Sequence, residues 1–529
     1  MNIELILYLL LLSIGGMFSM QRHLQMFQQN SYYPSRYFKW LKGSFSSATV
    51  ISIIFALVII FLTFVGLDII VISLAAISLI VRILKQQRVH KASIKKLVYT
   101  NRVKRLIITA SVIYLIFAVL CDILSGLYSR GLFLLIVIIT HFPNLIMLLA
   151  NLCNKPIEAF INNGFIKDAK RILKANKNLL TVGVTGSYGK TSVKFILNRI
   201  LSENFNVTVT PESFNTPMGV VRTVREKMKP QTEIFIAEMG AKNIGDIKEL
   251  CELADPTLAV ITAVGPQHLE TFGSIENVAN TKFELADHCL TKENGKIYIN
   301  CDSEDAYKKA ETINDKSKLV YFGTSENADC KAENIKFSPE GTSFNVMYRD
   351  FSFPLSCKLL GKHSVTNILG AAAMALDLGI SERQIRFAVS SLKAAPHRLE
   401  LKPFINGAVL IDDAYNSNPV GCLEAAKVLG SFEGMRRIIV TPGLVELGEN
   451  EYDYNKALGK AAAEFCDDII LVGQKRSIPL VDGVNNTNFK KEHLLVVDSF
   501  KEAMAHLQKM TAKNTVVLFE NDLPDNYAG

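Results

Sequence analysis

Residues 179–201, LLTVGVTGSYGKTSVKFILNRIL, hold the features that decide the fold of the larger part of this chain. An apolar run leads into a glycine-containing turn, and apolar residues then recur at helical spacing. This order predicts a buried strand, a turn and a helix that starts near Gly189. Gly186 and Gly189 let the main chain approach a ligand closely, and the amide groups at the helix start point toward an anion. The stretch therefore predicts a phosphate-binding loop in an α/β domain.

Two side chains after the second glycine fit nucleotide chemistry. Lys190 would reach the terminal phosphates of a nucleotide, and Thr191 would place its hydroxyl group on a magnesium ion. The spacing G-x-x-G-K-T is two residues shorter than the usual P-loop pattern, and glycine turns before helices are common. The strand–loop–helix context nevertheless favours nucleotide binding over a simple turn.

Two further apolar runs predict strands with ionisable residues near their carboxyl ends. The run 233–239 contains Glu238 near its end, and the run 258–264 is followed by His268. Parallel α/β sheets bind ligands at this edge. A carboxylate and an imidazole beside a phosphate loop suit a magnesium ion held between protein and nucleotide. Taken alone, His268 fits a helix-capping or buried histidine better.

The first 153 residues differ in composition from the rest. Residues 1–175 hold 19 Lys and Arg against 5 Asp and Glu, whereas the remaining chain is acidic on balance. Five apolar stretches are each close to the length that a transmembrane helix needs, about 20 residues. They lie at 3–20, 48–65, 67–84, 106–124 and 132–152. We therefore expect an α-helical transmembrane module at 1–153.

Alternate loops between these stretches are rich in Lys and Arg, which under the positive-inside rule predicts an amino terminus outside and a carboxyl terminus in the cytoplasm. This pattern predicts a multi-pass protein of the plasma membrane with its nucleotide-binding part on the cytoplasmic side. Residues 154–178 are basic and amphipathic, so we expect a linker along the inner membrane surface. The basic excess thus points to a membrane and away from nucleic acid. The nine cysteines form no C-x-x-C pair, which argues against a disulfide framework or a zinc ribbon.

A set of motifs in the second part of the chain resembles the Mur ligase family. The similarity covers about residues 179–519, and its closest branch is the one that adds D-alanyl-D-alanine to a muramoyl tripeptide. The motifs are TGSYGKTS at 185–192, AEMGA at 237–241, GPQHLETFGS at 265–274, GKHSVTN at 361–367, DDAYNSNP at 412–419 and VELGE at 445–449. The resemblance implies a central P-loop-type ATP-binding domain at 179–395 and a Rossmann-like carboxyl-terminal domain at 396–529.

The resemblance implies a reaction and two cofactors, ATP and Mg²⁺. Family enzymes phosphorylate a substrate carboxylate with ATP, and an amine then attacks the acyl phosphate, releasing ADP and phosphate. By this resemblance Gly186, Gly189, Lys190 and Thr191 hold the ATP phosphates, with Thr191 also on magnesium. Glu238 and His268 match a second metal site. Lys282 matches a lysine that relatives carbamylate and that helps to hold magnesium, although without the resemblance it reads as an ordinary surface lysine.

The resemblance also assigns residues farther along the chain. Asn367 matches a residue that contacts the nucleotide base. Arg398 is a candidate for stabilising the charge of phosphoryl transfer, and a salt bridge at the domain junction is the alternative. The loop with Asp413, Asn416 and Asn418 serves ribose and phosphate in the family, with Asn416 and Asn418 on the substrate side. Turn chemistry alone would explain these three residues equally well.

The chain departs from the family pattern in three places. The membrane module stands where soluble members have a domain that grips the uridine nucleotide of the substrate. Ser364 follows His363 where Asn is usual. The strand expected at 515–519 continues into Glu520 and Asn521 rather than into a Lys-Gly-Ser ending, which puts recognition of the incoming dipeptide in doubt.

These observations predict a membrane-anchored ATP-dependent amide ligase that joins an amino-acid or dipeptide amine to a cell-wall peptide precursor. The first departure favours a lipid-linked precursor, because a shared membrane surface raises effective concentration and makes a nucleotide grip dispensable. One alternative is synthesis of a poly-glutamate-type polymer. Another is a membrane scaffold or transporter with a degenerate nucleotide-binding domain, although Lys190, Glu238 and Lys282 keep the residue types that the chemistry needs.

Overall fold

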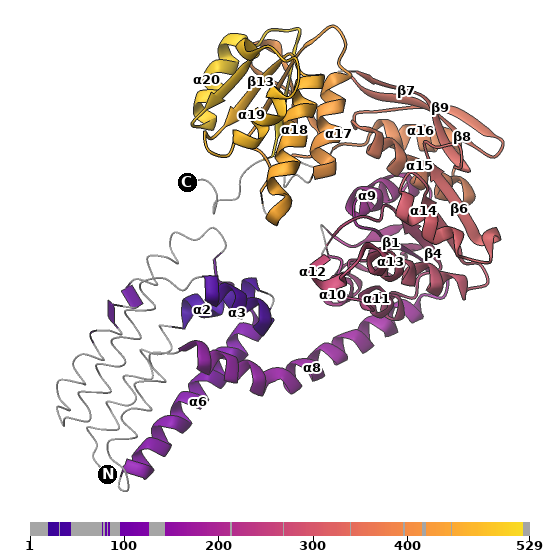
Figure 1. Ribbon diagram of the computed structural model, residues 1–529. Coiled ribbons are helices and arrows are strands. Elements are labelled where there is room, and N and C mark those ends of the chain that lie inside the picture. The colour runs from indigo at the N-terminus through magenta and orange to yellow at the C-terminus, as the bar shows by residue number, and fades with distance from the viewer. Residues whose placement is uncertain are drawn as a thin grey trace. The chain divides into compact units, whose positions relative to one another are not determined.

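The computed structural model divides the chain into two compact units, Met1–Phe165 and Ile166–Gly529, which are treated separately below (Figure 1). The structure describes only part of the chain. The described residues are 20–30, 32–43, 77, 80–81, 83–84, 96–125, 143–211, 214–267, 269–338, 340–394, 397–414, 419–445 and 447–521.

The described part of the first unit is helical. Its helices are α2 (Gln21–Gln29), α3 (Pro34–Gly43), α6 (Asn101–Ser125) and the first part of α8 (Pro143–Ala175). Apolar side chains from all four helices form one core, in which Phe27 and Tyr37 are fully buried. Arg105 on α6 donates two hydrogen bonds to Glu158 on α8, at 2.7 and 2.9 Å. Such a paired geometry fixes one helix against the other as well as adding charge attraction.

The expected membrane module is described only in small part. Of the five apolar stretches, 106–124 lies within α6 and the end of 132–152 lies within α8, whereas the other three fall almost wholly outside the described residues. No helix in the described ranges has the length and apolar character to cross a membrane. The expected linker at 154–178 begins inside α8, which continues without a break past Pro156.

The second unit begins with an α/β domain built on a nine-stranded sheet. The strand order is β2-β3-β1-β4-β5-β6-β7-β8-β9, with parallel pairing from β2 to β7 and antiparallel pairing from β7 to β9. The strands are β1 (Leu180–Thr185), β2 (Val207–Val209), β3 (Ile234–Glu238), β4 (Leu258–Ile261), β5 (Lys296–Asn300), β6 (Leu319–Gly323), β7 (Cys330–Ser338), β8 (Gly341–Tyr348) and β9 (Phe351–Cys357).

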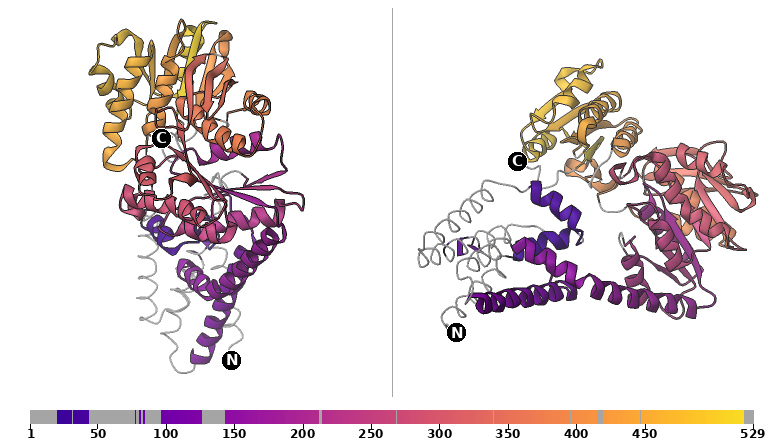
Figure 2. Two further views of the ribbon diagram at one scale, coloured as in Figure 1. Left: turned by 90° about the vertical axis from the view of Figure 1, so that its right-hand side faces the viewer. Right: turned by 60° about the horizontal axis from the view of Figure 1, so that its bottom comes forward.

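Helices cover both faces of this sheet, as expected for strands with continuous apolar runs (Figures 1 and 2). One face packs against α9 (Lys190–Leu201), α15 (Lys362–Asp377) and α16 (Glu382–Ser390). The other face packs against the end of α8 and against α10 (Pro217–Lys227), α11 (Asp246–Ala254), α13 (Ile275–Leu290) and α14 (Glu304–Glu311). A short helix, α12 (Leu269–Phe272), precedes α13.

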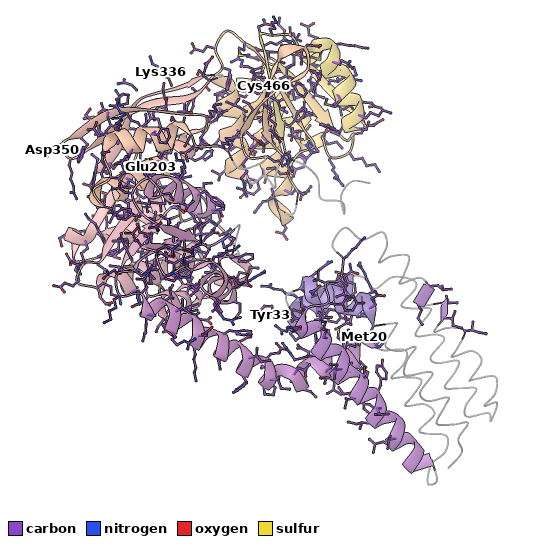
Figure 3. The ribbon with its side chains drawn as sticks, turned by 180° about the vertical axis from the view of Figure 1, so that it is seen from behind. Met20, Tyr33, Glu203, Lys336, Asp350 and Cys466 are labelled. Carbon is purple, nitrogen blue, oxygen red and sulfur yellow. The ribbon has the colours of Figure 1, made fainter. Side chains whose placement is uncertain are left out.

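The antiparallel extension β7–β9 was not expected from the sequence. Figure 3 labels Lys336 on β7 and Asp350 in the turn between β8 and β9. The extension is tied to the helical layer through Asp377 at the end of α15. Asp377 accepts hydrogen bonds from the hydroxyl groups of Tyr298 and Tyr348, and Lys296 Nζ lies 2.5 Å from its carboxylate.

The carboxyl-terminal domain has a six-stranded sheet in the order β10-β11-β15-β12-β13-β14, antiparallel only between β10 and β11. Its strands are β10 (Glu400–Pro403), β11 (Val409–Asp413), β12 (Arg436–Thr441), β13 (Asp468–Val472), β14 (Leu494–Val497) and β15 (Thr515–Glu520). One face packs against α17 (Pro419–Gly430), α18 (Glu451–Phe465) and α19 (Ile478–Asn485), and the other against α20 (Phe500–Met510). The prediction of two α/β domains is confirmed.

Two expected element boundaries that bear on the site were wrong. The strand expected at 258–264 ends at Ile261, because Thr262 and Ala263 bond to the phosphate loop instead. Asn367 lies on α15, which begins at Lys362. Asp413 is the last residue of β11 rather than part of the following loop, because its pairing with β15 continues to Glu520.

Candidate nucleotide and metal site

The phosphate loop joins β1 to α9 and requires glycine at two positions. Gly189 caps α9 with a φ of 82°, a conformation that only glycine adopts readily. Gly186 has a φ of 149°, and a Cβ atom there would lie 2.1 Å from Thr262 Oγ1. The loop therefore packs directly against the segment after β4, with its amide groups at the start of a twelve-residue helix.

Hydrogen bonds fix the phosphate loop to residues 262–267. Ser187 Oγ donates to the carbonyl oxygen of Gly265 at 3.0 Å, and the Tyr188 hydroxyl group donates to that of Pro266 at 2.9 Å. Thr262 Oγ1 donates to the carbonyl oxygen of Tyr188. These bonds bring the segment before His268 to the loop, as the sequence predicted for the ends of β1 and β4. His268 itself lies outside the described residues, so its role stays a prediction.

The first turn of α9 presents Lys190 and Thr191. Lys190 Nζ donates to the carbonyl oxygens of Gly186 and Ser187, at 2.6 and 3.0 Å, so its ammonium group lies over the loop. Burial lowers the pKa of Lys190 from its usual value. Thr191 Oγ1 donates to Glu238 Oε2 at 3.0 Å. The structure thus brings together Gly186, Gly189, Lys190, Thr191 and Glu238, as predicted.

Glu238 is the last residue of β3 and is almost completely buried. Besides Thr191, its carboxylate receives a hydrogen bond from Asn215 Nδ2 at 3.1 Å and faces Lys194 Nζ at 3.0 Å. Parallel pairing sets Val184 of β1 beside Glu238, and this register places the carboxylate next to the start of the phosphate loop.

Lys282 lies on α13 and is 1% exposed, so the reading as a surface lysine is wrong. Burial, and next the positive charge of Lys190, lower the pKa of Lys282 from 10.5 to about 7. A large fraction of this amine is therefore neutral near pH 7, which is the form that reacts with carbon dioxide.

Asn367 reaches the phosphate loop from α15. It is buried, and its Oδ1 atom would lie 3.1 Å from a Cβ atom at Gly189. The preceding residue is also fixed, because the Thr366 hydroxyl group donates to Asp302 Oδ2 at 2.9 Å. The amide of Asn367 therefore lies close to the helix start that would face the phosphates. Contact with the base stays a prediction.

The predicted residues of the carboxyl-terminal domain are described only in part. Asp413 Oδ1 accepts the amide hydrogen of Leu399 at 3.0 Å, and burial raises the pKa of Asp413. Arg398 is exposed between His397 and Leu399, both of which have positive φ values of 59° and 44°. Asp413 also lies beside Glu520 in the sheet. Asn416 and Asn418 lie outside the described residues.

The chemistry of these groups fits ATP and Mg²⁺. The amide groups at the start of α9 form the kind of site that binds an anion, and Lys190 supplies a positive charge. The Thr191 hydroxyl and the Glu238 carboxylate are oxygen ligands of the kind that Mg²⁺ prefers. Within the described residues, His, Cys, Asp and Glu do not gather in threes as they would at a zinc-type site.

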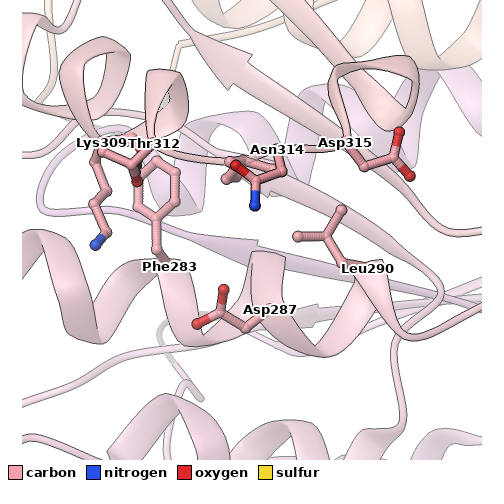
Figure 4. A pocket seen from close by; sticks show the side chains of 8 residues that line it. Phe283, Asp287, Leu290, Lys309, Thr312, Asn314 and Asp315 are labelled. Carbon is pink, nitrogen blue, oxygen red and sulfur yellow. Dashed lines mark hydrogen bonds between the residues drawn. The ribbon is translucent and has the colours of Figure 1, made fainter.

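One surface cavity of about 310 Å³ lies away from these predicted residues (Figure 4). It is formed by α13, α14 and the segment that follows α14, and contains the side chains of Phe283, Asp287 and Lys309. None of the predicted site residues contributes to this cavity, so the site is defined by the loop chemistry and not by cavity size.

Comparisons with known proteins agree with this geometry. Residues 184–375 match the family description "Mur ligase middle domain", and residues 397–520 match "Mur ligase, glutamate ligase domain". The UDP-N-acetylmuramoyl-tripeptide–D-alanyl-D-alanine ligase of Bacillus subtilis (strain 168) is 30% identical over 340 residues, which are 64% of this chain and 72% of the relative. The chain belongs to the Mur ligase family. This Mur ligase is therefore an ATP-dependent enzyme that forms amide bonds and uses Mg²⁺.

Other relatives support the same assignment. The ligase of the same name from Escherichia coli (strain K12) is 32% identical over 305 residues, covering 57% of this Mur ligase and 67% of the relative. The crystal structure of MurF from Acinetobacter baumannii superposes with a TM-score of 0.59 at 25% identity, over 68% of this chain and 77% of that one. MurF from Thermotoga maritima in complex with ADP gives 0.57 at 26% identity, over 68% and 80%.

Three further residues shape the site and were not predicted from the sequence: Tyr188, Lys194 and Asn215. The position of Lys194 could have been predicted from the sequence. It follows Thr191 by three residues, and this spacing places both residues on one face of a helix. No local sequence pattern places Asn215 or Tyr188 at the site. Their hydrogen-bond partners, Glu238 and Pro266, lie far away in the sequence.

The buried amine of Lys282 predicts a pH-dependent stability difference. Below pH 7 the folded enzyme bears the full cost of a buried ammonium group, whereas between pH 7 and 10.5 only the unfolded chain keeps the proton. Wild-type stability should therefore rise with pH in this window. We expect Lys282→Met to be more stable than wild type at pH 7, with the difference narrowing by about 2 kcal/mol by pH 9.

Urea unfolding in CO₂-free buffer measures this difference, because carbamylation would restore a charge at Lys282. The matched control is Lys248→Met, which changes an exposed lysine on α11. The difference in free energy of unfolding between Lys248→Met and wild type should stay constant between pH 7 and 9. A constant difference for Lys282→Met as well would contradict the assigned pKa.

Proposed function

We propose that this Mur ligase adds a dipeptide of the D-alanyl-D-alanine type to a muramoyl-peptide precursor of the cell wall. The observation that supports this most is the combined match of the middle and glutamate ligase domains to ligases of that name. The phosphate loop, Glu238 and Lys282 supply the groups that such a reaction requires.

The phosphate loop and the residues around Glu238 would have different roles in the reaction. The loop amides and Lys190 bind the phosphates and stabilise the negative charge that spreads over them during transfer. Magnesium, when bound, neutralises phosphate charge and orients the transferred group. Thr191 and Glu238 would hold it from the protein side. The substrate carboxylate becomes an acyl phosphate, the amine then attacks its carbonyl carbon, and phosphate leaves.

We propose that Lys282 acts as a carbamate. Its side chain is enclosed, and its amine is near enough to Lys190 for the two charges to repel. Carbon dioxide would convert this amine into an anion, which attracts Lys190 and adds oxygen ligands for magnesium. We expect a carbamate signal by ¹³C NMR after equilibration with ¹³C-labelled bicarbonate. The signal should be absent from Lys282→Met, and its persistence in that variant would contradict the assignment.

We propose that residues 1–153 anchor the enzyme in the plasma membrane, with the ligase domains on the cytoplasmic side. The support is the sequence: apolar stretches near membrane length, separated by loops that are alternately rich in Lys and Arg. The enzyme should stay in the membrane fraction after extraction at alkaline pH. Release into the supernatant under these conditions would refute the anchor.

We propose further that the substrate is lipid-linked. The membrane module stands where soluble relatives grip a uridine nucleotide, and a surface shared by enzyme and substrate raises their effective concentration. Synthesis of a poly-glutamate-type polymer is the second candidate, because one of the matching domains is described as a glutamate ligase domain. The two candidate functions differ in their products. Addition of a dipeptide gives a single adduct, whereas polymer synthesis gives products of many chain lengths.

The test offers the full-length enzyme, in detergent or liposomes, a nucleotide-linked and a lipid-linked muropeptide together with D-alanyl-D-alanine. Phosphate release and mass spectrometry of the product are the measurements. We expect faster turnover of the lipid-linked form, and Lys190→Ala should lower phosphate release by about 10²-fold or more because a phosphate-binding charge is lost. Equal or better turnover of the nucleotide-linked form would refute the lipid proposal.

A further inference from the structure

Lys194 forms a completely enclosed ion pair beside the phosphate loop. Its side chain is 0% exposed and that of Glu238 is 1% exposed, with Nζ and Oε2 separated by 3.0 Å. Lys194 is on the second turn of α9, inside the core between the helix and the sheet. The ammonium group also lies 4.5 Å from the centre of the Phe195 ring.

A contribution to folding stability does not readily explain the buried ion pair between Lys194 and Glu238. Removing two charges from water is costly, and well-packed apolar residues often replace buried ion pairs without loss of stability. The surrounding core is strongly apolar, since Val193, Ile196 and Leu197 are all buried beside Lys194 on the same helix. An ion pair in this place therefore points to a role for the charge itself.

The position of the pair indicates that role. Thr191 and Lys194, three residues apart on α9, both contact Oε2 of Glu238, while Asn215 binds Oε1. Three donors from two segments thus fix both oxygens of the carboxylate. Groups that orient a metal-binding residue in this way set its geometry, and their loss commonly weakens metal binding or activity about 10- to 100-fold.

We infer that Lys194 is a positioning residue for phosphoryl transfer, which holds the Glu238 carboxylate against Thr191 and so sets the affinity of the site for a divalent cation. This inference rests on the use of ATP and Mg²⁺ by the enzyme. Lys190 and Lys194 then have different tasks. Lys190 lies over the loop carbonyl groups, where phosphates would bind, whereas Lys194 pairs with the carboxylate of Glu238.

Two variants of the full-length enzyme separate charge from position. Lys194→Met removes the charge. Lys194→Arg keeps the charge, but its planar, larger head group cannot place one compact ammonium 3.0 Å from Oε2 in an enclosed space. If Lys194 only balanced the charge of Glu238, Lys194→Arg would bind metal as well as wild type does.

The measurement is Mn²⁺ binding by electron paramagnetic resonance in the presence of a non-hydrolysable ATP analogue. Binding of the same analogue in EDTA is measured in parallel. We expect Lys194→Met to weaken Mn²⁺ binding about 10- to 100-fold, and Lys194→Arg to weaken it by about threefold or more. Analogue binding in EDTA should stay unchanged in both variants, since the charge of Lys194 is paired with Glu238.

The control is Lys296→Met, which breaks the ion pair with Asp377 in the same domain. It should lower the midpoint of urea unfolding but leave Mn²⁺ binding at the wild-type value. Wild-type Mn²⁺ binding by Lys194→Arg would overturn the inference, whether or not Lys194→Met folds. A wild-type enzyme that binds the analogue but no Mn²⁺ would instead overturn the magnesium-dependent function on which the inference rests.

Discussion

The carboxylate of Glu238 is the point at which the active part of this enzyme is held together. It ends β3, receives hydrogen bonds from Thr191 and Asn215 and pairs with Lys194, so it joins the central sheet, the phosphate-loop helix and the segment before α10. This arrangement depends on the parallel pairing of β1 and β3, whose register sets Val184 beside Glu238. A buried charge with well-directed donors tolerates little displacement, because any movement leaves a charge unpaired.

The distribution of positive charge follows from the same geometry. Lys190, Lys194 and Lys282 approach a single small region, and only Lys194 has the buried carboxylate as its direct partner. Burial, and next the positive charge of Lys190, lower the pKa of Lys282 to about 7, so a large fraction of its amine is neutral near pH 7. Such a region attracts phosphate anions, and under our proposal a carbamate formed on Lys282 would add a further negative charge. The enzyme thus has an electrostatic preference for its cofactor before any substrate is considered.

Under our proposal, the two parts of the chain divide recognition from chemistry. The second unit contains the phosphate loop, the Glu238 network and both sheets, and it matches the Mur ligase domains over most of its length. We propose that the first unit takes the place of a domain that recognises a nucleotide handle. Its excess of Lys and Arg and its apolar stretches suit a membrane surface, which under our proposal supplies substrate by proximity instead of by a nucleotide grip.

Sequence alone determined the α/β class, the phosphate loop and the convergence of Glu238 with Thr191, because glycine spacing, apolar runs and the rule for strand ends are local patterns. The three-residue spacing of Thr191 and Lys194 also predicts that the two side chains lie on the same face of a helix. Only the tertiary structure decided the rest. It buried Lys282 and lowered the pKa of its amine. It shortened β4 so that Thr262 could bond to the loop, and it brought Asn215, Tyr188 and Asn367 to the site. These features depend on desolvation and on contacts between segments remote in sequence, and no local pattern encodes either.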